Sequence, residues 1–247
     1  MDKRVRLDTS LVERGLCQSR TEAQELIKQN LVFVDGVLCE KSAKGVLVTS
    51  TIELHGKRKF VSRGGEKLHG ALQDIFGEEK NIENHIKDSL ALDIGSSTGG
   101  FSDCLLKYGV RHIDAVDVGS NQFHTQLRDN RKITLYENKD IRTFHSGKDY
   151  QIIVCDISFI STATMLPVIV SFAKEKRCHF FILIKPQFEV GRGNTKKGIV
   201  KDTSLTKQIL LDVKNKAVDL NLKDIQLVPS RIQGGDGNQE YFLYGTK

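Results

Sequence analysis

From Ser89 onward, short apolar runs alternate with amphipathic stretches, and this alternation restricts the possible folds more than any other feature of the sequence. The apolar runs have the length of buried strands, and the stretches between them have the length and periodicity of helices. Parallel strands joined through helices form a sheet that is covered on both faces. The sequence therefore predicts a doubly wound α/β domain, whose last strand follows a Gly-Gly-Asp-Gly turn and enters the sheet antiparallel.

The apolar runs and the amphipathic stretches set the expected boundaries of this domain's elements. Strands are expected at residues 89–94, 111–116, 132–136, 151–155, 179–184, 223–228 and 239–245. Helices are expected at residues 99–107, 121–129, 161–174 and 203–220. Open sheets of this kind bind ligands beyond the carboxyl ends of their strands, so we expect functional residues in the segments that follow the strands.

The pattern changes near residue 60. Before it, the apolar positions between residues 7 and 30 fit two short helices, and Ser19 with Glu22 forms a capping box at the start of the second. Short strands around an Asp-Gly hairpin turn complete a small α+β unit. We therefore expect an N-terminal domain at residues 1–58, a linker with a Gly-Gly hinge at residues 59–65, and the doubly wound domain at residues 66–247.

Basic charge is concentrated at the start of the chain. The net charge is +6, and residues 1–60 hold half of this excess, with 11 Lys and Arg against 8 Asp and Glu. Such a balance favours an anionic partner, although it also suits an ordinary basic enzyme. The most basic run, Lys-Arg-Lys-Phe at residues 57–60, is explained equally well as a solvated linker and as a nucleic-acid contact.

The helix pair and the following Leu-Val-Phe-Val-Asp-Gly at residues 31–36 resemble the RNA-binding domain that a small-subunit ribosomal protein shares with pseudouridine synthases and some tRNA synthetases. In that family, basic side chains on the helix after the capping serine and on the flanking loops lie against RNA phosphates. The resemblance implies the same role for the matching residues here, although any one of them alone is more often solvated surface. The candidate RNA contacts are Arg4, Arg6, Arg14, Arg20 and Lys28, to which the expected linker region adds Arg58 and Arg63.

A glycine-rich loop follows the first strand of the doubly wound domain, with the sequence Asp-Ile-Gly-Ser-Ser-Thr-Gly-Gly-Phe at residues 93–101. Its glycines let the backbone turn sharply and approach a ligand closely. The spacing G-x-x-x-G-G differs from the G-x-G-x-x-G of dinucleotide sites, and Asp93 stands next to where a pyrophosphate would lie. A cationic or zwitterionic ligand such as S-adenosylmethionine fits better. The candidate cofactor contacts in this loop are Asp93, Gly95, Ser96, Ser97, Gly99, Gly100 and Phe101.

Two further acidic residues follow the next two strands. Asp117 ends the second strand, where a carboxylate can accept hydrogen bonds from both hydroxyls of a ribose. Asp140 follows the third strand, where it could accept a hydrogen bond from the amino group of adenine. Each acid alone is more often a cap or a surface residue. Three acids behind three successive strands, together with the glycine loop, favour a site for S-adenosylmethionine.

The fourth and fifth strands of the expected sheet end in Asp156 and Lys185. Adjacent parallel strands end at the same edge, so these side chains are expected side by side, next to the methyl donor. Lys185 could activate a hydroxyl by offering positive charge, or by accepting its proton if desolvation lowers the pKa of the lysine; these residues alone leave both roles open. A buried structural ion pair is the alternative.

Four segments together closely resemble the TlyA family, often labelled haemolysin A, over essentially the whole chain. They are Ser-Arg-Gly-Gly-Glu-Lys-Leu at 62–68, the glycine loop at 93–101, Asp-Ile-Ser-Phe-Ile at 156–160 and Lys-Pro-Gln-Phe-Glu at 185–189. The resemblance implies a Rossmann-like, FtsJ-like methyltransferase domain that depends on S-adenosylmethionine. It also implies that the reaction is 2'-O-methylation of ribose in ribosomal RNA, either free or within ribosomal subunits.

Ribose methyltransferases of this kind carry a Lys-Asp-Lys-Glu tetrad, and the matching positions here are Lys67, Asp156, Lys185 and Glu240. The resemblance implies that Lys185 activates the ribose 2'-hydroxyl and that Asp156 orients Lys185. It further implies that Lys67 and Glu240 position the ribose and complete the charge network. Without the resemblance, a helix lysine beside Glu66 would be expected to face solvent.

The sequence is compatible with three alternative functions. The haemolysin label suggests a membrane-active protein, but no apolar run approaches the roughly 20 residues of a membrane-spanning helix, and the charged N-terminus leads into no apolar signal segment. We therefore expect a cytoplasmic protein without membrane insertion.

A second alternative changes the acceptor to DNA, protein or a small molecule, although Asp-Ile-Ser-Phe after the fourth strand differs from the Asn/Asp-Pro-Pro-aromatic sequence usual in amino-group methyltransferases. The third is an RNA-binding protein with an inactive catalytic fold.

Cysteine and histidine spacing gives no indication of a metal site. The seven histidines are dispersed, and no C-x-x-C or zinc-ligand spacing occurs. We expect reduced, mostly buried thiols at Cys17, Cys39, Cys104, Cys155 and Cys178.

Overall fold

The computed structural model describes residues 4–17, 19–56, 59–174, 177–190, 195, 198–235 and 237–247. The chain divides into two compact units, residues 1–58 and 59–247. Each unit has its own hydrophobic core. Arg58, one of the expected RNA contacts, lies outside the described residues.

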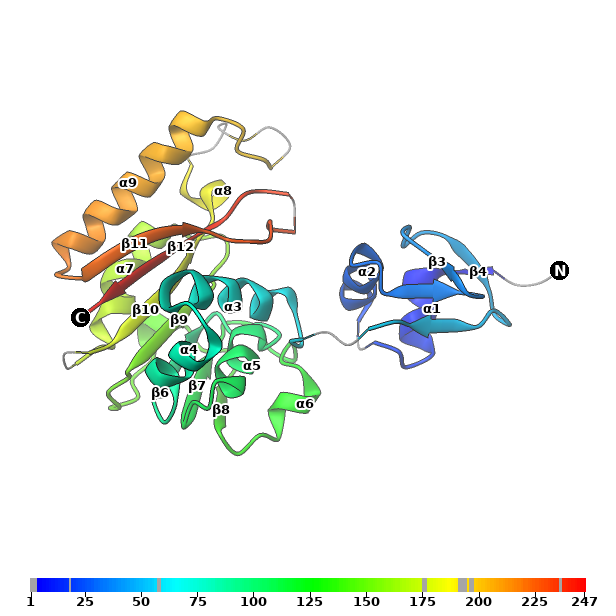
Figure 1. Cartoon of the computed structure of the whole chain (residues 1–247), viewed down its shortest axis with the longest axis horizontal. Helices are drawn as coiled ribbons and strands as arrows, with labels where there is room; N and C mark the ends of the chain where they lie inside the picture. The colour runs from blue at the N-terminus through cyan, green and yellow to red at the C-terminus, as the bar shows by residue number, and fades with distance from the viewer. Residues whose placement is uncertain are drawn as a thin grey trace. The chain divides into compact units, whose positions relative to one another are not determined.

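A seven-stranded sheet forms the centre of the second unit, in the order β11-β12-β10-β9-β6-β7-β8 (Figure 1). The five strands from β10 to β8 run parallel, and β12 is antiparallel to both of its neighbours, as expected. The doubly wound α/β prediction is therefore confirmed. The strands are β6 (Leu90–Ile94), β7 (His112–Val116), β8 (Ile133–Tyr136), β9 (Ile152–Cys155), β10 (His179–Ile184), β11 (Lys223–Pro229) and β12 (Tyr241–Thr246).

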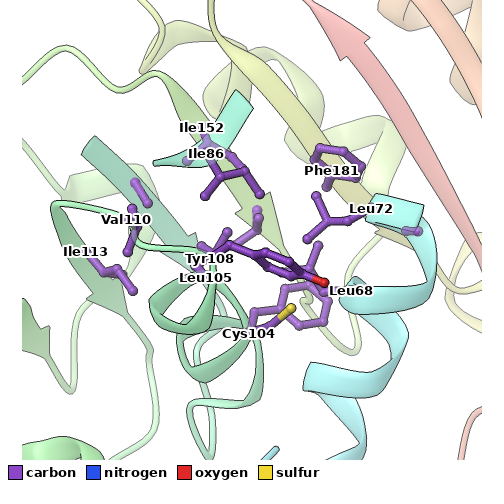
Figure 2. Packing of buried hydrophobic residues seen from close by; sticks show 14 of the residues in the cluster. Leu68, Leu72, Ile86, Cys104, Leu105, Tyr108, Val110, Ile113, Ile152 and Phe181 are labelled. Atoms are coloured by element: carbon purple, nitrogen blue, oxygen red, sulfur yellow. The ribbon is translucent and has the colours of Figure 1, made fainter. Parts of the chain in front are cut away.

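Helices cover both faces of this sheet because side chains alternate along each strand. One face packs against α3 (Arg63–Phe76), α4 (Glu79–Ile86) and α5 (Gly100–Lys107), and the other against α7 (Thr162–Ser171) and α9 (Thr203–Asp219). Figure 2 shows the first of these two cores, in which Leu68 and Leu72 of α3 lie near Phe181 of β10. Fully burying a side chain of this size contributes roughly 1.5 to 3 kcal/mol, so the core fixes the position of α3 on the sheet.

Three short elements differ from the sequence prediction. The helix expected at residues 121–129 is reduced to α6 (Thr125–Arg128), and α8 (Pro186–Glu189) begins directly after Lys185. A 3-10 turn, η1 (Ile141–Thr143), follows Asp140. Segments of three or four residues complete only about one helical turn, so their apolar pattern is too short to define their bounds.

Residues 59–65 are part of the second unit rather than a linker. Phe60 is buried, and the backbone N–H of Val61 donates to Asp103 of α5 at 2.8 Å. Helix α3 begins at Arg63, three residues earlier than the expected domain start. A Cβ at Gly65 would lie 2.9 Å from the carbonyl oxygen of Gly100, so this glycine allows α3 to approach the glycine loop closely and does not act as a hinge.

The first unit contains two helices, α1 (Leu7–Glu13) and α2 (Arg20–Lys28), and two small sheets. The Ser19 hydroxyl accepts from the N–H of Glu22, as the capping box predicts. The three-stranded sheet is formed by β2 (Val32–Val34), β3 (Val37–Leu38) and β5 (Ile52–Leu54). A second pairing, between β1 (Arg4–Arg6) and β4 (Gly45–Leu47), was not predicted from the sequence.

Within the described ranges, no helix is both long and apolar enough to cross a membrane.

Candidate active site

A pocket of about 380 Å³ lies beyond the carboxyl ends of β6, β7 and β9. This is the edge at which open parallel sheets bind their ligands. The residues that line the pocket include Gly95, Ser97, Asp117, Asp140, Asp156 and Ser158. The second unit therefore brings residues from four of the expected functional segments to one place.

The glycine loop forms one wall of this pocket. Gly95 has a φ of 76°, and a Cβ there would lie 2.4 Å from the carbonyl oxygen of Asp156, so no other residue fits without a shift of the backbone. Gly99, at a φ of 85°, is the N-cap of α5. At both positions, the positive φ and the closeness of neighbouring atoms require a glycine.

Asp93 is fully buried and is not among the residues that line the pocket. One carboxylate oxygen accepts from the Ser102 hydroxyl at 2.6 Å, and the other is buried without a partner among the described residues. Burial raises the pKa of Asp93 to about 7. Four more of the expected loop contacts are buried and are not among the lining residues: Ser96, Gly99, Gly100 and Phe101.

Asp117 is held firmly at the end of β7. Its two carboxylate oxygens accept from the backbone N–H groups of Ser97 and Gly119 at 2.7 and 2.6 Å. A carboxylate has about four acceptor positions, so both oxygens retain capacity for ribose hydroxyls. Asp140 also lines the pocket, but its carboxylate already accepts from the backbone and the guanidinium of Arg142, so an adenine amino group would have to share it.

Replacing Asp117 with alanine should weaken cofactor binding by about tenfold or more. Hydrogen bonds to a charged acceptor contribute about 1.5 to 3 kcal/mol, and the loop around Ser97 also loses its anchor. Calorimetric titration with S-adenosylmethionine measures the effect. Asp129→Ala, which removes an exposed carboxylate at the end of α6, is the matched control. Equal affinities for the two variants would remove Asp117 from the cofactor site.

Asp156 and Lys185 form an ion pair at the ends of the neighbouring strands β9 and β10, with Oδ1 and Nζ 2.5 Å apart. The Lys185 side chain is only 11% exposed. Its Nζ also donates to the Ser158 hydroxyl at 2.8 Å and lies 5.9 Å from the ring centre of Phe188. Lys185 is thus fixed by several partners at the rim of the pocket that Asp156 and Ser158 line.

Lys67 and Glu240 form a second ion pair, and both are buried, with Nζ and Oε2 2.5 Å apart. Lys67 lies one turn into α3, and Glu240 immediately precedes β12. In the antiparallel register of β10 and β12, Ile184 is opposite Tyr241, and one further step places Lys185 opposite Glu240. All four residues of the expected tetrad therefore lie at the same edge of the sheet.

Two features of this site had only weak signals in the sequence. Ser158, which accepts from Lys185, lies two residues after Asp156 and could have been proposed from that spacing. Phe159 also lines the pocket, is 90% exposed and has a φ of 66°, which is unusual for a bulky residue. No sequence pattern indicates that backbone conformation.

The expected RNA contacts are found in different situations. Arg4, Arg6, Arg20 and Lys28 are exposed on the first unit, and Arg6 and Arg20 both pair with Asp8. Arg14 instead donates to three backbone carbonyl groups of its own unit, at Leu47, Val48 and Ser50. Arg63 belongs to the second unit and donates to the carbonyl of Gln233. Both therefore have structural bonds that an RNA contact would have to share.

The residues of the pocket fit S-adenosylmethionine. Carboxylates of Asp117, Asp140 and Asp156 suit a cationic ligand, and Gly95 leaves space for one beside the backbone. Ser96 lies between the lining residues Gly95 and Ser97, and its buried hydroxyl has no partner among the described residues, so it is available to a ligand or a water molecule. Those residues include no cluster of three or more His, Cys, Asp or Glu suited to a metal ion. The sheet, the glycine loop and the acidic pocket define a domain with the fold of S-adenosylmethionine-dependent methyltransferases.

Comparison with known proteins agrees with this class. The FtsJ-like methyltransferase family matches residues 60–247, and the S4 domain matches residues 5–52. Hemolysin A from Brachyspira hyodysenteriae is 40% identical over 97% of this chain and 99% of its own length. The 16S/23S rRNA (cytidine-2'-O)-methyltransferase TlyA from Mycobacterium tuberculosis is 37% identical over 99% of this chain and 90% of its own length.

Solved structures agree as well. A hemolysin-like structure from Streptococcus thermophilus has a TM-score of 0.75 at 31% identity, covering 100% of this chain and 90% of that chain. An S-adenosylmethionine-dependent methyltransferase from Listeria monocytogenes shares the fold, with a TM-score of 0.53 at 10% identity over 75% of this chain and 98% of that one. The chain belongs to the TlyA family, in which an S4 domain precedes an FtsJ-like methyltransferase domain.

Proposed function

We propose that this protein transfers a methyl group from S-adenosylmethionine to a ribose 2'-hydroxyl of ribosomal RNA, with cytidine as the acceptor nucleoside. The observation that carries the proposal is the pair of ion pairs, Asp156–Lys185 and Lys67–Glu240, at the edge of a pocket that fits the cofactor. A relative at 37% identity carries the name of an rRNA cytidine-2'-O-methyltransferase, which supports the choice of acceptor. A ribosomal RNA substrate also implies that the protein acts in the cytoplasm.

When bound, S-adenosylmethionine supplies a methyl group on a positively charged sulfur. Lys185 activates the acceptor, because an ammonium group held by Asp156 can donate to the 2'-oxygen and stabilise the negative charge that develops there. The Ser158 hydroxyl accepts from the same Nζ and limits its movement. The 2'-oxygen forms its bond to the methyl carbon while its proton passes to solvent water. A donor that is already fixed needs no reorganisation during this step, and this pre-organisation lowers the barrier.

Lys67 and Glu240 support this arrangement from the adjacent position. Their side chains are 10% and 3% exposed, so their attraction is screened little by water. The register between β10 and β12 places Glu240 across from Lys185. We assign to this pair the positioning of the acceptor ribose and the balance of charge around the two lysines.

The first unit supplies RNA affinity in this proposal. Its exposed basic residues, its S4 match and its separate core make it an independent docking module. Deleting residues 1–58 should leave cofactor affinity unchanged and weaken binding to ribosomal RNA severely, and the RNA affinity of the full chain should fall steeply with salt. Filter binding at several salt concentrations, with calorimetry in parallel, checks both results. A truncated protein that binds and methylates ribosomal RNA normally would contradict the docking role.

The acceptor itself is tested by radiolabelled methyl transfer. Purified protein with labelled S-adenosylmethionine is offered unmodified ribosomal RNA, DNA or a protein extract, and labelled RNA is digested to nucleosides. The proposal predicts label in RNA only, recovered as 2'-O-methylcytidine. Label on a base, in DNA or in protein would contradict it.

A further inference from the structure

A buried carboxylate organises basic residues on the first unit. Asp8, in the first turn of α1, is fully buried, yet its partners are surface residues. Arg6 at the end of β1 and Arg20 at the start of α2 both pair with it. The side chains of Arg6 and Arg20 are 48% and 57% exposed. One buried charge thus connects two exposed guanidinium groups that come from different elements.

The hydrogen bonds at Asp8 use both of its oxygens. Arg6 donates through Nε and Nη2, at 3.0 and 2.8 Å, in the two-bond geometry that matches a carboxylate. Arg20 Nη2 and Gln24 Nε2 donate to the same oxygen, Oδ2, at 3.1 and 2.9 Å. The backbone N–H of Thr9 donates to the other, at 2.9 Å. The Arg6 guanidinium holds the pKa of Asp8 well below its usual range, so the carboxylate stays ionised.

The two arginines keep donors for a ligand after these bonds are made. Arg6 Nη1, and Nε and Nη1 of Arg20, have no acceptor among the residues that the structure describes. Arg14 differs, because its guanidinium is used by three backbone carbonyls. An anion that reaches this surface therefore finds two guanidiniums that are already held in place.

We propose that Asp8 is a positioning residue that holds Arg6 and Arg20 together as one receptor for RNA phosphate groups. This inference rests on the proposed docking of the first unit on ribosomal RNA. Long basic side chains lose rotamer freedom when they bind an anion, and holding them beforehand removes part of that cost. The negative charge of Asp8 itself repels RNA phosphates. Asp8 therefore increases RNA affinity only if holding Arg6 and Arg20 in place contributes more than this repulsion.

The variant Asp8→Asn distinguishes the positioning of the arginines from the effect of net charge, because the two change RNA affinity in opposite directions. The substitution removes one negative charge, and a surface that acts by net charge alone would bind RNA more tightly. Loss of organisation predicts weaker binding instead, by about tenfold, since ordering each long side chain costs roughly two- to tenfold in affinity. Glu13→Gln is the matched control: it removes one negative charge from an exposed position of the same helix and should bind as tightly as the wild type or more tightly.

The measurement is filter binding of the full-length protein to an unmethylated 23S ribosomal RNA transcript across a salt series. Arg6→Ala with Arg20→Ala should reduce the slope of log affinity against log salt by about one to two. Weaker binding by Asp8→Asn than by Glu13→Gln supports the proposal, and equal binding overturns it. If the arginine variant binds like the wild type, the docking role of this surface fails and the proposal with it.

A second pair of variants covers the case in which Asp8→Asn unfolds the first unit, as judged by hydrogen exchange. Both Arg6→Lys and Arg20→Lys keep the net charge. The first loses the two-bond geometry of Arg6 with Asp8, and the second replaces the planar guanidinium that Asp8 holds through Nη2 with a flexible ammonium group. The proposal predicts that each binds RNA severalfold more weakly than the wild type at every salt concentration. Wild-type affinity for both lysine variants would overturn it.

Discussion

Replacing Lys185 with alanine should reduce methyl transfer to ribosomal RNA by about a hundredfold or more, while cofactor affinity stays within about twofold of the wild type. The pocket lining includes Asp156 and Ser158 but not Lys185, so the cofactor keeps its contacts. In the proposed mechanism, the negative charge that develops on the acceptor oxygen loses the ammonium group that stabilises it. Single-turnover transfer from labelled S-adenosylmethionine, with calorimetry in parallel, measures the two quantities separately.

Two comparison variants make this result specific. Lys80→Ala removes an exposed lysine of α4 and should leave transfer unchanged. Asp156→Asn should reduce transfer about as much as Lys185→Ala, and the double variant should lose little more, because the two side chains act as one unit. Near-normal transfer by Lys185→Ala would show that the ion pair is structural and would remove the main support for a ribose hydroxyl as acceptor.

Replacing Lys67 with methionine should destabilise the second unit by about 3 to 5 kcal/mol and also abolish most transfer. The change leaves the Glu240 carboxylate, which is 3% exposed, without its partner, and an uncompensated buried charge is costly. Urea unfolding, followed by a probe in the second unit, measures the stability. Lys67 and Glu240 are far apart in the sequence, so this loss reports directly on the packing of α3 against the end of the sheet.

The double variant Lys67→Met with Glu240→Gln separates stability from catalysis. It removes both charges, so it should recover much of the stability lost in the single variant, since a buried pair replaced as a whole is often nearly neutral. Transfer should stay low, because the charge network beside Lys185 is still missing. Recovery of transfer together with stability would mean that this pair only holds the fold and takes no part in positioning the ribose.

Much of the sheet edge could be predicted from the sequence because its signals are local. Apolar runs of strand length identify β6, β9 and β10. A charged residue lies in the last part of β6 or directly after the other two strands: Asp93, Asp156 and Lys185. The rule that adjacent parallel strands end together then predicts the Asp156–Lys185 pair, which the structure shows at 2.5 Å. No tertiary information was needed for that step.

Other features depend on contacts between distant segments, and the local sequence pattern does not show these contacts. From the local sequence, Lys67 is expected to be a helix lysine that faces solvent, because its partner, Glu240, is 173 residues away. Arg14 reads as an RNA contact, but its acceptors lie in the turn after β4 and near β5. Asp93 reads as a ligand contact, although its side chain is turned into the core toward Ser102 of α5.

The first unit ends at residue 58, as predicted, but the prediction of a linker after it was wrong for a related reason. Two adjacent glycines, such as Gly64 and Gly65, are typical of a hinge. Here, however, position 65 requires glycine because Phe60 and Gly100 lie against it and leave no space for a side chain. Close packing and chain flexibility both favour glycine, so only the neighbouring residues show which of the two explains a given glycine. The sequence predicted a linker at residues 59–65, where the structure has the start of the second unit.

The central claim, that Lys185 of this chain directs methylation to ribose in ribosomal RNA, is tested most directly by mapping 2'-O-methyl groups. Ribosomal RNA is taken from cells that lack the protein, from the same cells supplied with the wild type, and from cells supplied with Lys185→Ala. We predict one or a few ribose positions, at cytidines, that are methylated only with the wild-type protein. Ribosomal RNA with no ribose position that depends on the protein, or with positions methylated equally by Lys185→Ala, would contradict the account.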